Sequence, residues 1–419
     1  MFSEKKAVLI LLLVISFSLK SEAQLSPGQY LEEAPLGTWN IFGIESGSAL
    51  GCGFCQLTAA YSGTVGLTNP ALLSYLPKAN LTFNLGFSQT QLFKYWLVNT
   101  GVLTTSGNLF FRSLQINFIN FSYRFWGWNV ALIFARTENY SRPHLSYQDY
   151  YNGLVTHQLD ISQAGQLKNY AFSLSRRLNS KLSLGISFIW LDGHIQRNLE
   201  ESWPSDQVVM IDQRYQKISG FYPLIGLTYR ISSRLKTGLS FIPPYHKKVQ
   251  GQSLLAYRSP SGNTNIEIKG EAFDQIKMPA IISLGMSYSL EKNLDIMLET
   301  TYFGWNRYLY SYFGEARSEK FRQVIRLGSG LEYRTTFRFF GRNWDSPYYF
   351  GVMIDPQPMT DIKSTYYYLT FGFGLGNQYL NLSLSTAIGM EKGSGRNLKN
   401  QKISLTLDLH MPQILRRQK

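Results

Sequence analysis

Stretches that alternate apolar and polar residues recur about fourteen times along this chain, and the gaps between them are alternately long and short. In one such stretch, Leu182, Leu184 and Ile186 alternate with Ser183 and Gly185. A strand in the wall of a transmembrane β-barrel shows one face to lipid and the other to the lumen, so its residues alternate with period two. The pattern predicts an all-β fold, an antiparallel transmembrane barrel of about fourteen strands.

The predicted barrel occupies 79–411, and its strands have roughly the 9–11 residues that a tilted membrane strand needs. The predicted strands are 79–88, 114–125, 128–136, 169–177, 181–191, 222–231, 234–242, 280–289, 293–303, 322–334, 347–354, 366–376, 379–388 and 402–411. The gaps over 137–168 and 192–221 are long, whereas 125–128 is a tight turn. Because outer-membrane barrels have short periplasmic turns and long external loops, both termini are expected in the periplasm. The connection over 335–346 does not fit, since it is long where a short turn is expected.

Composition limits the alternatives to a barrel. Only 16% of the residues are charged, and the mean hydropathy is −0.14. No internal run reaches the roughly 18 apolar residues of a spanning helix, which argues against a helical membrane protein. The net charge of +14 comes from dispersed residues without a nucleic-acid module, so it indicates anionic headgroups or anionic ligands. A soluble β-sandwich is the less favoured fold, because the apolar faces are rich in aromatic residues.

The N-terminal residues have the order of regions that a secretory signal peptide has. Lys5 and Lys6 are the basic region, 7–19 is apolar, and Ala23 ends a small-residue cleavage site. The apolar stretch is too short to span a bilayer comfortably. We therefore predict a signal peptide over 1–23 and an exported chain; an uncleaved anchor is the alternative.

Residues 24–78 precede the first predicted strand and lack its alternation. They are rich in small residues but also carry Leu, Phe, Trp and Tyr, which disordered tails usually lack. A barrel of this size has a wide lumen, so something must fill it or it leaks. We predict that 24–78 form a hatch, or plug, in the lumen; a disordered periplasmic tail is the alternative. Cys52 and Cys55 lie here, and in an exported chain they are interpreted as a local disulfide.

The alternation slips by one residue in the second predicted strand. Leu114 and Phe118 share one phase, whereas Ile119 and Phe121 share the other. One extra residue is the mark of a β-bulge, which bends the strand. A kink at Phe118, Ile119 and Asn120 would part neighbouring strands and open the wall laterally, or it would be an innocuous bulge.

The same parity selects two arginines as ligand-binding candidates. If Phe121 and Tyr123 face lipid, Arg124 faces the lumen, and Arg326 does so in a later strand. An inward arginine can hold a carboxylate through paired hydrogen bonds. The alternative is that it pairs with glutamate or supports the plug.

Enzymatic motifs do not appear in the chain. It has no Ser nucleophile elbow, no His-Glu-x-x-His and no phosphate loop. The five histidines are scattered, with no two at metal-ligand spacing. Neither a catalytic function nor a metal or other cofactor is predicted.

A Gly/Ala-rich stretch runs into Asn69-Pro70-Ala71 just before the first strand, and further short motifs follow it in order. These later motifs are 225–230, 277–280, 301–305 and 330–333. Together they resemble the FadL/TodX (OMPP1) family of outer-membrane transporters, and the similarity covers most of the exported chain. Two features depart from the family pattern, namely the Cys pair and the C-terminal basic tail over 412–419.

The resemblance implies a fourteen-stranded barrel closed by a hatch, with Asn69, Pro70 and Ala71 in the hatch motif. It implies transport of hydrophobic small molecules, such as long-chain fatty acids or hydrocarbons, by facilitated diffusion with lateral exit at an inward strand kink. The surroundings would be the outer-membrane bilayer and lipopolysaccharide, without a nucleic-acid partner. The oligomeric state is not predicted.

A second function fits the same barrel. A secretion-system component could use a FadL-like barrel to hold exported proteins at the cell surface. The long Tyr-rich loops over 137–151 and 304–316 would suit protein contact as well as lipid capture.

Overall fold

The computed structural model describes most of the predicted barrel and part of the predicted hatch. The described residues are 46–59, 61–97, 105–204, 207–259, 265–308, 311–312, 315–316, 321–339, 341–358, 360, 363–393 and 399–411. The predicted signal peptide (1–23), the start of the hatch (24–45) and the basic tail (412–419) lie outside them. In the part of the chain that the structure describes, no helix has the length and apolar character to cross a bilayer.

Short helices precede a long series of strands. The helices are α3 (Gly47–Gly51), η1 (Gly63–Leu67), η2 (Pro70–Tyr75) and, much later, η3 (Trp305–Arg307). The strands are β1 (Ala79–Leu97), β2 (Thr105–Phe125), β3 (Trp128–Asn139), β4 (Arg142–Tyr151), β5 (Leu154–Arg177), β6 (Leu182–Trp203), β7 (Val208–Arg230), β8 (Leu235–Ile242), β9 (Tyr245–Arg258), β10 (Asn265–Met278), β11 (Ile281–Glu291), β12 (Leu294–Phe303), β13 (Ser311–Tyr312), β14 (Glu315–Ala316), β15 (Val324–Phe339), β16 (Arg342–Pro356), β17 (Thr365–Gly376), β18 (Leu380–Lys392) and β19 (Lys399–His410).

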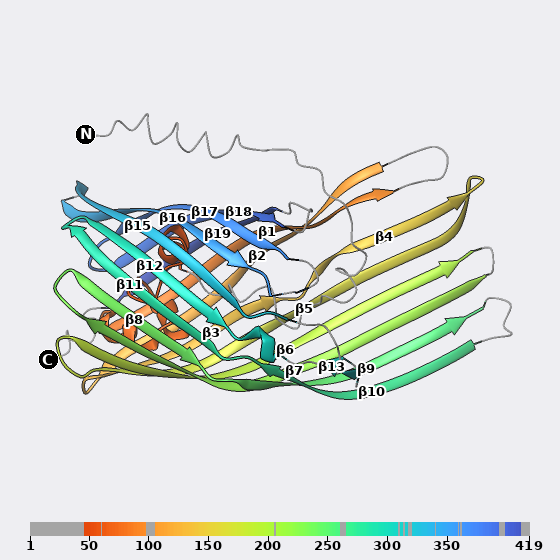
Figure 1. Ribbon diagram of the computed structural model, residues 1–419, viewed down its shortest axis with the longest axis horizontal. Helices are drawn as coiled ribbons and strands as arrows, with labels where there is room; N and C mark the ends of the chain where they lie inside the picture. The colour runs from red at the N-terminus through yellow and green to blue at the C-terminus, as the bar shows by residue number, and fades with distance from the viewer. Residues whose placement is uncertain are drawn as a thin grey trace.

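All strands except the small β13–β14 ribbon form one antiparallel sheet that closes into a barrel (Figure 1). The closure is the pairing of β1 with β19, from Asn80 opposite His410 to Thr90 opposite Asn400. A closed barrel leaves no unpaired sheet edge along this join, which is what a membrane requires. The predicted all-β, fourteen-stranded antiparallel barrel is confirmed, and its described strands run from Ala79 to His410.

Seventeen sheet segments make fourteen wall strands because three wall strands are interrupted. β7 pairs with β8 near the short turns and with β9 farther along, so β8 and β9 follow one path. β10 pairs with β9 and β11 pairs with β8, so β10 and β11 together form a second wall strand. β3 and β4 both pair with β5 and form a third. The first two breaks contain Pro243-Pro244 and Pro279. Proline lacks the N–H that a ladder needs, so the pairing stops there.

Several predicted loops are in fact strand. β5, β6 and β7 have 24, 22 and 23 residues, and they include most of the predicted loops over 137–168 and 192–221. The hairpins β4–β5, β6–β7 and β9–β10 project beyond the rest of the barrel (Figure 1). The predicted long connection over 335–346 is also wrong, because β15 and β16 remain paired as far as Phe339 and Arg342.

The outward face changes character along these long strands. On β6, Leu184 and Trp190 are 40% and 47% exposed, and the next outward residues are polar, beginning with Asp192. On β7, the outward Phe221 is followed in the same direction by Ser219 and then Lys217. An apolar outward band of about nine to eleven residues is what a tilted membrane strand presents to lipid. The projecting hairpins therefore continue the ladder outside the apolar band.

The described residues of 46–76, which are all but residue 60, lie inside the barrel, toward the end with the short turns (Figure 1). The backbone N–H of Gly47 donates to Thr406 Oγ1 on β19, and that of Gln56 donates to Glu299 Oε2 on β12. Only a segment in the lumen can touch such distant parts of the wall. We call residues 46–76 the lumenal segment; that it closes the lumen as a hatch stays a prediction.

Candidate functional site

The Asn-Pro-Ala motif anchors the lumenal segment to the wall. Asn69 is the N-cap of η2, and its Oδ1 accepts from the backbone N–H of Ala71 at 3.3 Å. Its Nδ2 donates to the carbonyls of Leu57 at 2.8 Å and Leu227 at 3.2 Å. Pro70 occupies the first helical position, where the missing N–H costs nothing. The motif therefore joins two turns of the lumenal segment to β7.

Small residues on the wall allow this close approach. An added Cβ at Gly185 on β6 would lie 2.4 Å from the carbonyl carbon of Pro70. At Gly226 on β7 it would lie 2.3 Å from Asn69 Oδ1. The sequence contained a signal for this contact, because both glycines occupy positions of inward parity in otherwise regular strands.

Replacing Asn69 with alanine should loosen the lumenal segment. The change removes the cap and the side-chain bonds to Leu57 and Leu227, a loss of about 1–3 kcal/mol. Limited proteolysis of the detergent-solubilised barrel should then cleave within 46–76 faster than in the wild type. Asn179→Ala is a matched control, since Asn179 caps an exposed turn by accepting from Lys181 and Leu182. Equal cleavage in both variants would contradict the anchoring role.

Wall carboxylates also hold the lumenal segment. Glu299 Oε2 on β12 accepts from the backbone N–H groups of Gln56 at 2.8 Å and Leu57 at 3.1 Å. Glu332 Oε2 on β15 accepts from the hydroxyl of Tyr61 at 2.6 Å. Hydrogen bonds to a charged acceptor are about twice as strong as neutral ones. The parity that turns Arg326 inward also turns Glu332 inward, whereas sequence reasoning missed Glu299, although a single acidic residue at inward parity in an apolar strand was a usable signal.

The predicted disulfide is not formed, because Cys52 and Cys55 are both free and buried. Cys52 Sγ lies 3.7 Å from the carbonyl oxygen of Leu331, while Cys55 Sγ lies 3.9 Å from that of Gly53. The turn between them has a left-handed Gly53 at φ 65°. It directs the two thiols to different neighbours, so spacing alone misled the prediction.

These thiols should be unreactive while the protein is folded. Burial raises the pKa of both Cys52 and Cys55 well above the ordinary value, with the charge of Glu332 or Glu299 adding to it. The thiolate is the nucleophile, so a raised pKa and burial both suppress alkylation. Mass spectrometry after treatment with N-ethylmaleimide should show an unlabelled native protein and two labelled thiols after denaturation without a reductant. If the two thiols are labelled only after a reductant is added, the predicted disulfide between Cys52 and Cys55 would be supported instead.

The predicted phase slip coincides with a bulge. The register between β1 and β2 shifts at Asn84 and Leu85, which pair with Phe118 and Ile116 and leave Asn117 without a partner. Phe118 and Asn120 are fully buried. The structure thus places the irregularity beside the predicted kink residues; a role in lateral opening stays a prediction.

A seam separates β2 from β3 beyond this bulge. The described β2–β3 ladder runs only from Phe118, opposite Ala135, to the turn, whereas β2 stays paired with β1 as far as Thr105. Past the ladder, side chains bridge the two strands: Arg136 Nη1 donates to Gln115 Oε1 at 3.0 Å. A second bridge joins Asn139 to Ser113, also at 3.0 Å. Side-chain bonds therefore replace backbone pairing in this part of the wall.

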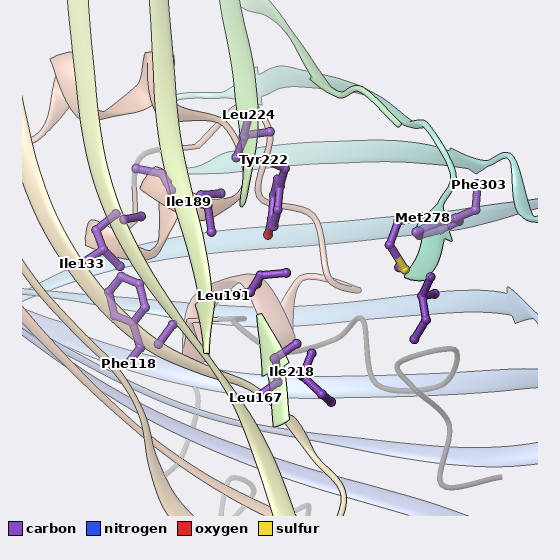
Figure 2. Packing of buried hydrophobic residues seen from close by; sticks show 14 of the residues in the cluster. Phe118, Ile133, Leu167, Ile189, Leu191, Ile218, Tyr222, Leu224, Met278 and Phe303 are labelled. Carbon is purple, nitrogen blue, oxygen red and sulfur yellow. The ribbon is translucent and has the colours of Figure 1, made fainter. Parts of the chain in front are cut away.

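The lumen behind the seam is packed with apolar side chains (Figure 2). Phe118 and Ile218 are 0% exposed and Leu167 is 1% exposed, in one cluster with Val65 and Leu72 of the lumenal segment. Figure 2 shows cluster members that reach the interior from different parts of the wall, with Phe118 and Ile133 distant from Met278 and Phe303. Side chains without accessible surface leave no water-sized space beside them, so these residues fill the interior rather than line a channel.

An ion pair adds to this packing. Lys247 Nζ on β9 lies 3.1 Å from Glu138 Oε1 on β3, and the two side chains are 1% and 9% exposed. The hydroxyl of Tyr140 donates to Glu138 Oε2 at 2.6 Å. In the barrel β5, β6 and β7 lie between β3 and β9, so this contact ties two separated parts of the wall together.

The two candidate arginines, Arg124 and Arg326, have different neighbours in the structure. Arg124 Nη2 donates to the carbonyls of Ser74 at 3.0 Å and Leu76 at 2.9 Å, so it supports the end of η2. The guanidinium of Arg326 lies over the ring of Phe303, 5.5 Å from its centroid. The structure does not bring Arg124 and Arg326 into one site, and their ligand roles stay predictions.

An apolar concavity of about 600 Å³ lies in the wall formed by β8, β11, β12, β15 and β16. Leu284, Leu298 and Leu327 line it and are about half exposed on the outward face. It therefore faces the bilayer and is separate from both candidate arginines of the lumen. Among the described residues, no cluster of His, Cys, Asp or Glu is arranged to hold a metal ion.

Comparison with known proteins gives one family and one fold. A family model described as BamG matches residues 5–410. Among solved structures, the chain is similar to a Pseudomonas aeruginosa FadL homologue, with TM-score 0.63 and 12% identity over 88% of this chain and 99% of that one. The monoaromatic hydrocarbon channel CymD and the Ralstonia pickettii toluene transporter TbuX each give TM-score 0.59 and 14% identity, over 88% of this chain and 98% of theirs. At such low identity these structures share the fold alone. No curated protein sequence matches the chain.

Proposed function

Because the chain belongs to the BamG family, whose model spans residues 5–410, we propose that it is an accessory subunit of the outer-membrane β-barrel assembly (BAM) machinery. The family name follows the nomenclature of that machinery. An accessory subunit of a membrane complex needs a lipid-facing wall and surfaces for partners, but no open pore. The FadL-like barrel would then be a structural element, kept without its transport path.

The packing behind the β2–β3 seam carries this proposal. In a hydrocarbon channel, a ligand must pass from the lumen to the lateral gap, so the residues there need accessible surface. Here Phe118 and Ala135, where the ladder ends, are 0% exposed, and Leu72 of the lumenal segment belongs to the same cluster. A path at this place would require the whole cluster to move. This arrangement favours a closed scaffold over a conduit.

Affinity purification tests the proposal. The chain, tagged at the exposed turn 152–153 between β4 and β5, is solubilised in a mild detergent from its native membrane, and the bound proteins are identified by mass spectrometry. A BamA-type insertase should be more abundant in this purification than in a control purification of a similarly tagged FadL-type transporter from the same cells. Depletion of the chain should lower the level of other outer-membrane barrels. Enrichment of secreted surface proteins without the insertase would instead favour the role of a holder for exported proteins.

Transport of hydrophobic molecules is the second candidate, and the seam between β2 and β3 favours it. Side-chain bridges such as Arg136 to Gln115 could part more easily than a backbone ladder. Cells that produce the chain should then take up labelled fatty acid or toluene faster than cells with an empty vector. Deletion of residues 69–71 should change that uptake while the barrel still assembles. Uptake equal to that of the vector control would rule out transport and leave the assembly role as the one remaining candidate.

A further inference from the structure

Basic side chains surround the mouth of the lumen at the short-turn end. Arg124 on β2, Arg177 on β5, Arg230 on β7 and Lys236 on β8 all occupy inward-facing positions next to the tight turns. The ring of Tyr75, at the end of η2, lies between two of them: Arg177 Cζ is 4.2 Å and Lys236 Nζ 5.6 Å from its centroid. We call these four cations the basic mouth.

Like charges are placed against one another in the basic mouth. Arg230 and Lys236 are directly opposite partners in the β7–β8 ladder. Directly opposite like charges destabilise an antiparallel pair. Arg124 and Arg177 converge on one acceptor, because the Nη2 of each donates to the carbonyl of Ser74, at 3.0 and 3.3 Å. A neutral acceptor holds both guanidiniums but cancels neither charge.

The nearby carboxylates already have a partner. Asp295 on β12 and Glu332 on β15 both bind Arg334, at 3.0 and 2.7 Å. Over the residues that the structure describes, no salt bridge joins a carboxylate to any of the four cations of the basic mouth. Arg334 balances only one of the two carboxylate charges, and the other acts at a distance on Lys236. Among the described residues the four cations of the mouth therefore keep an excess of positive charge, which an anionic ligand from outside the chain would relieve.

We propose that the basic mouth docks an acidic polypeptide segment of a partner protein that lies on the short-turn side of the membrane. The four cations face the axis of the lumen, whereas lipid headgroups surround the perimeter of a barrel. The outward basic residues Arg176 and Arg342 lie over the rings of Trp128 and Tyr379, in the manner of an interfacial belt, and are the ones that headgroups reach. The proposal rests on the proposed function only in assuming a protein partner.

Docking of an acidic segment would also change the contacts that hold the lumenal segment. Carboxylates that approach Arg124 and Arg177 compete with the carbonyl of Ser74 for the same donors, and charged acceptors bind guanidinium more strongly than neutral ones. The ring of Tyr75, at the end of η2, is in contact with Arg177 and Lys236. An occupied mouth would therefore hold η2 less tightly than an empty one.

Peptide binding tests the proposal. The full-length protein is placed in nanodiscs of zwitterionic lipid, and the binding of a fluorescein-labelled decaglutamate peptide is followed by anisotropy. Arg230→Gln with Lys236→Gln should weaken binding by about ten-fold or more, because two charges that face the ligand are lost. The charge-preserving variant Arg230→Lys should bind like the wild type. Affinity should fall as salt is added.

The matched control is Arg176→Gln with Arg342→Gln, which removes the same charge from the outward face of the same end. It should leave the affinity for decaglutamate nearly unchanged. Equal loss in both double variants, or undiminished binding in the Arg230/Lys236 variant with normal heat-modifiable migration, would overturn the proposal. Binding of the protein to vesicles of anionic phosphatidylglycerol should instead be weakened by the loss of the outward pair, Arg176 and Arg342. Failure to co-purify the assembly machinery would refute the proposed function but leave this binding result intact.

Discussion

Replacing Gly351 with valine should drive the lumenal segment from the wall and make the barrel leak. A Cβ at Gly351 on β16 would lie 2.2 Å from the backbone nitrogen of Gly53, and one at Gly330 on β15 would lie 2.3 Å from the carbonyl oxygen of Cys52. Both obstacles are backbone atoms, so no side chain can turn away. Overpacking at one such contact typically costs about 1–3 kcal/mol.

Leakage is measured as the influx of a large hydrophilic antibiotic, such as vancomycin, into cells that produce each variant at equal level. Gly351→Val should sensitise the cells strongly, whereas the wild type should not. Gly304→Ala is the control, because a Cβ there meets no atom closer than 3.5 Å and none from the lumenal segment. If a folded Gly351→Val barrel stays as tight as the control, the segment does not seal the lumen at this contact.

Replacing Lys247 with methionine should destabilise the barrel, since it leaves Glu138 charged and buried without its partner. Breaking one side of a buried ion pair costs about 3–5 kcal/mol. The hydroxyl of Tyr140 still donates to Glu138, but a neutral donor does not replace an ammonium. The double variant Lys247→Met with Glu138→Gln should recover much of the loss, because it removes both charges together.

The measurement is the temperature at which the heat-modifiable band of the folded barrel disappears. The control is Lys269→Met, which breaks a 2.9 Å ion pair with Glu267 whose side chains are 78% and 50% exposed. Exposed pairs contribute little, so this midpoint should stay at the wild-type value. Equal midpoints for Lys247→Met and Lys269→Met would show that the buried contact does not stabilise the barrel.

The apolar part of each wall strand could be predicted from the sequence, but not its full length. On β6, Leu184 and Trp190 face lipid, and the period-two pattern marks them because lipid admits only apolar side chains. Beyond Asp192 the outward face is polar, so hydrophobicity no longer alternates although the ladder with β7 continues to Trp203. Backbone pairing does not need apolar side chains, which is why the sequence pattern predicts a loop over 192–221 where the structure has strand.

The candidate site was partly predictable. Asn69-Pro70-Ala71 was identified as a motif, and the structure shows why these residue types are there: a cap, a first-turn proline and a side chain with no exposed surface. The carboxylate of Glu299, which completes the contacts, was missed. Glu299 and Gln56 are 243 positions apart, and nothing local in the sequence relates them.

The sequence by itself determined the class of molecule, since alternation, strand length and turn spacing are local properties that the bilayer imposes on each strand separately. Only the tertiary structure decided what fills the cylinder. Lys247 meets Glu138, and Cys52 remains a free thiol beside Leu331, because closure of the barrel brings distant inward faces together. Such contacts depend on the circumference and register of the whole wall, which no single segment of the chain encodes.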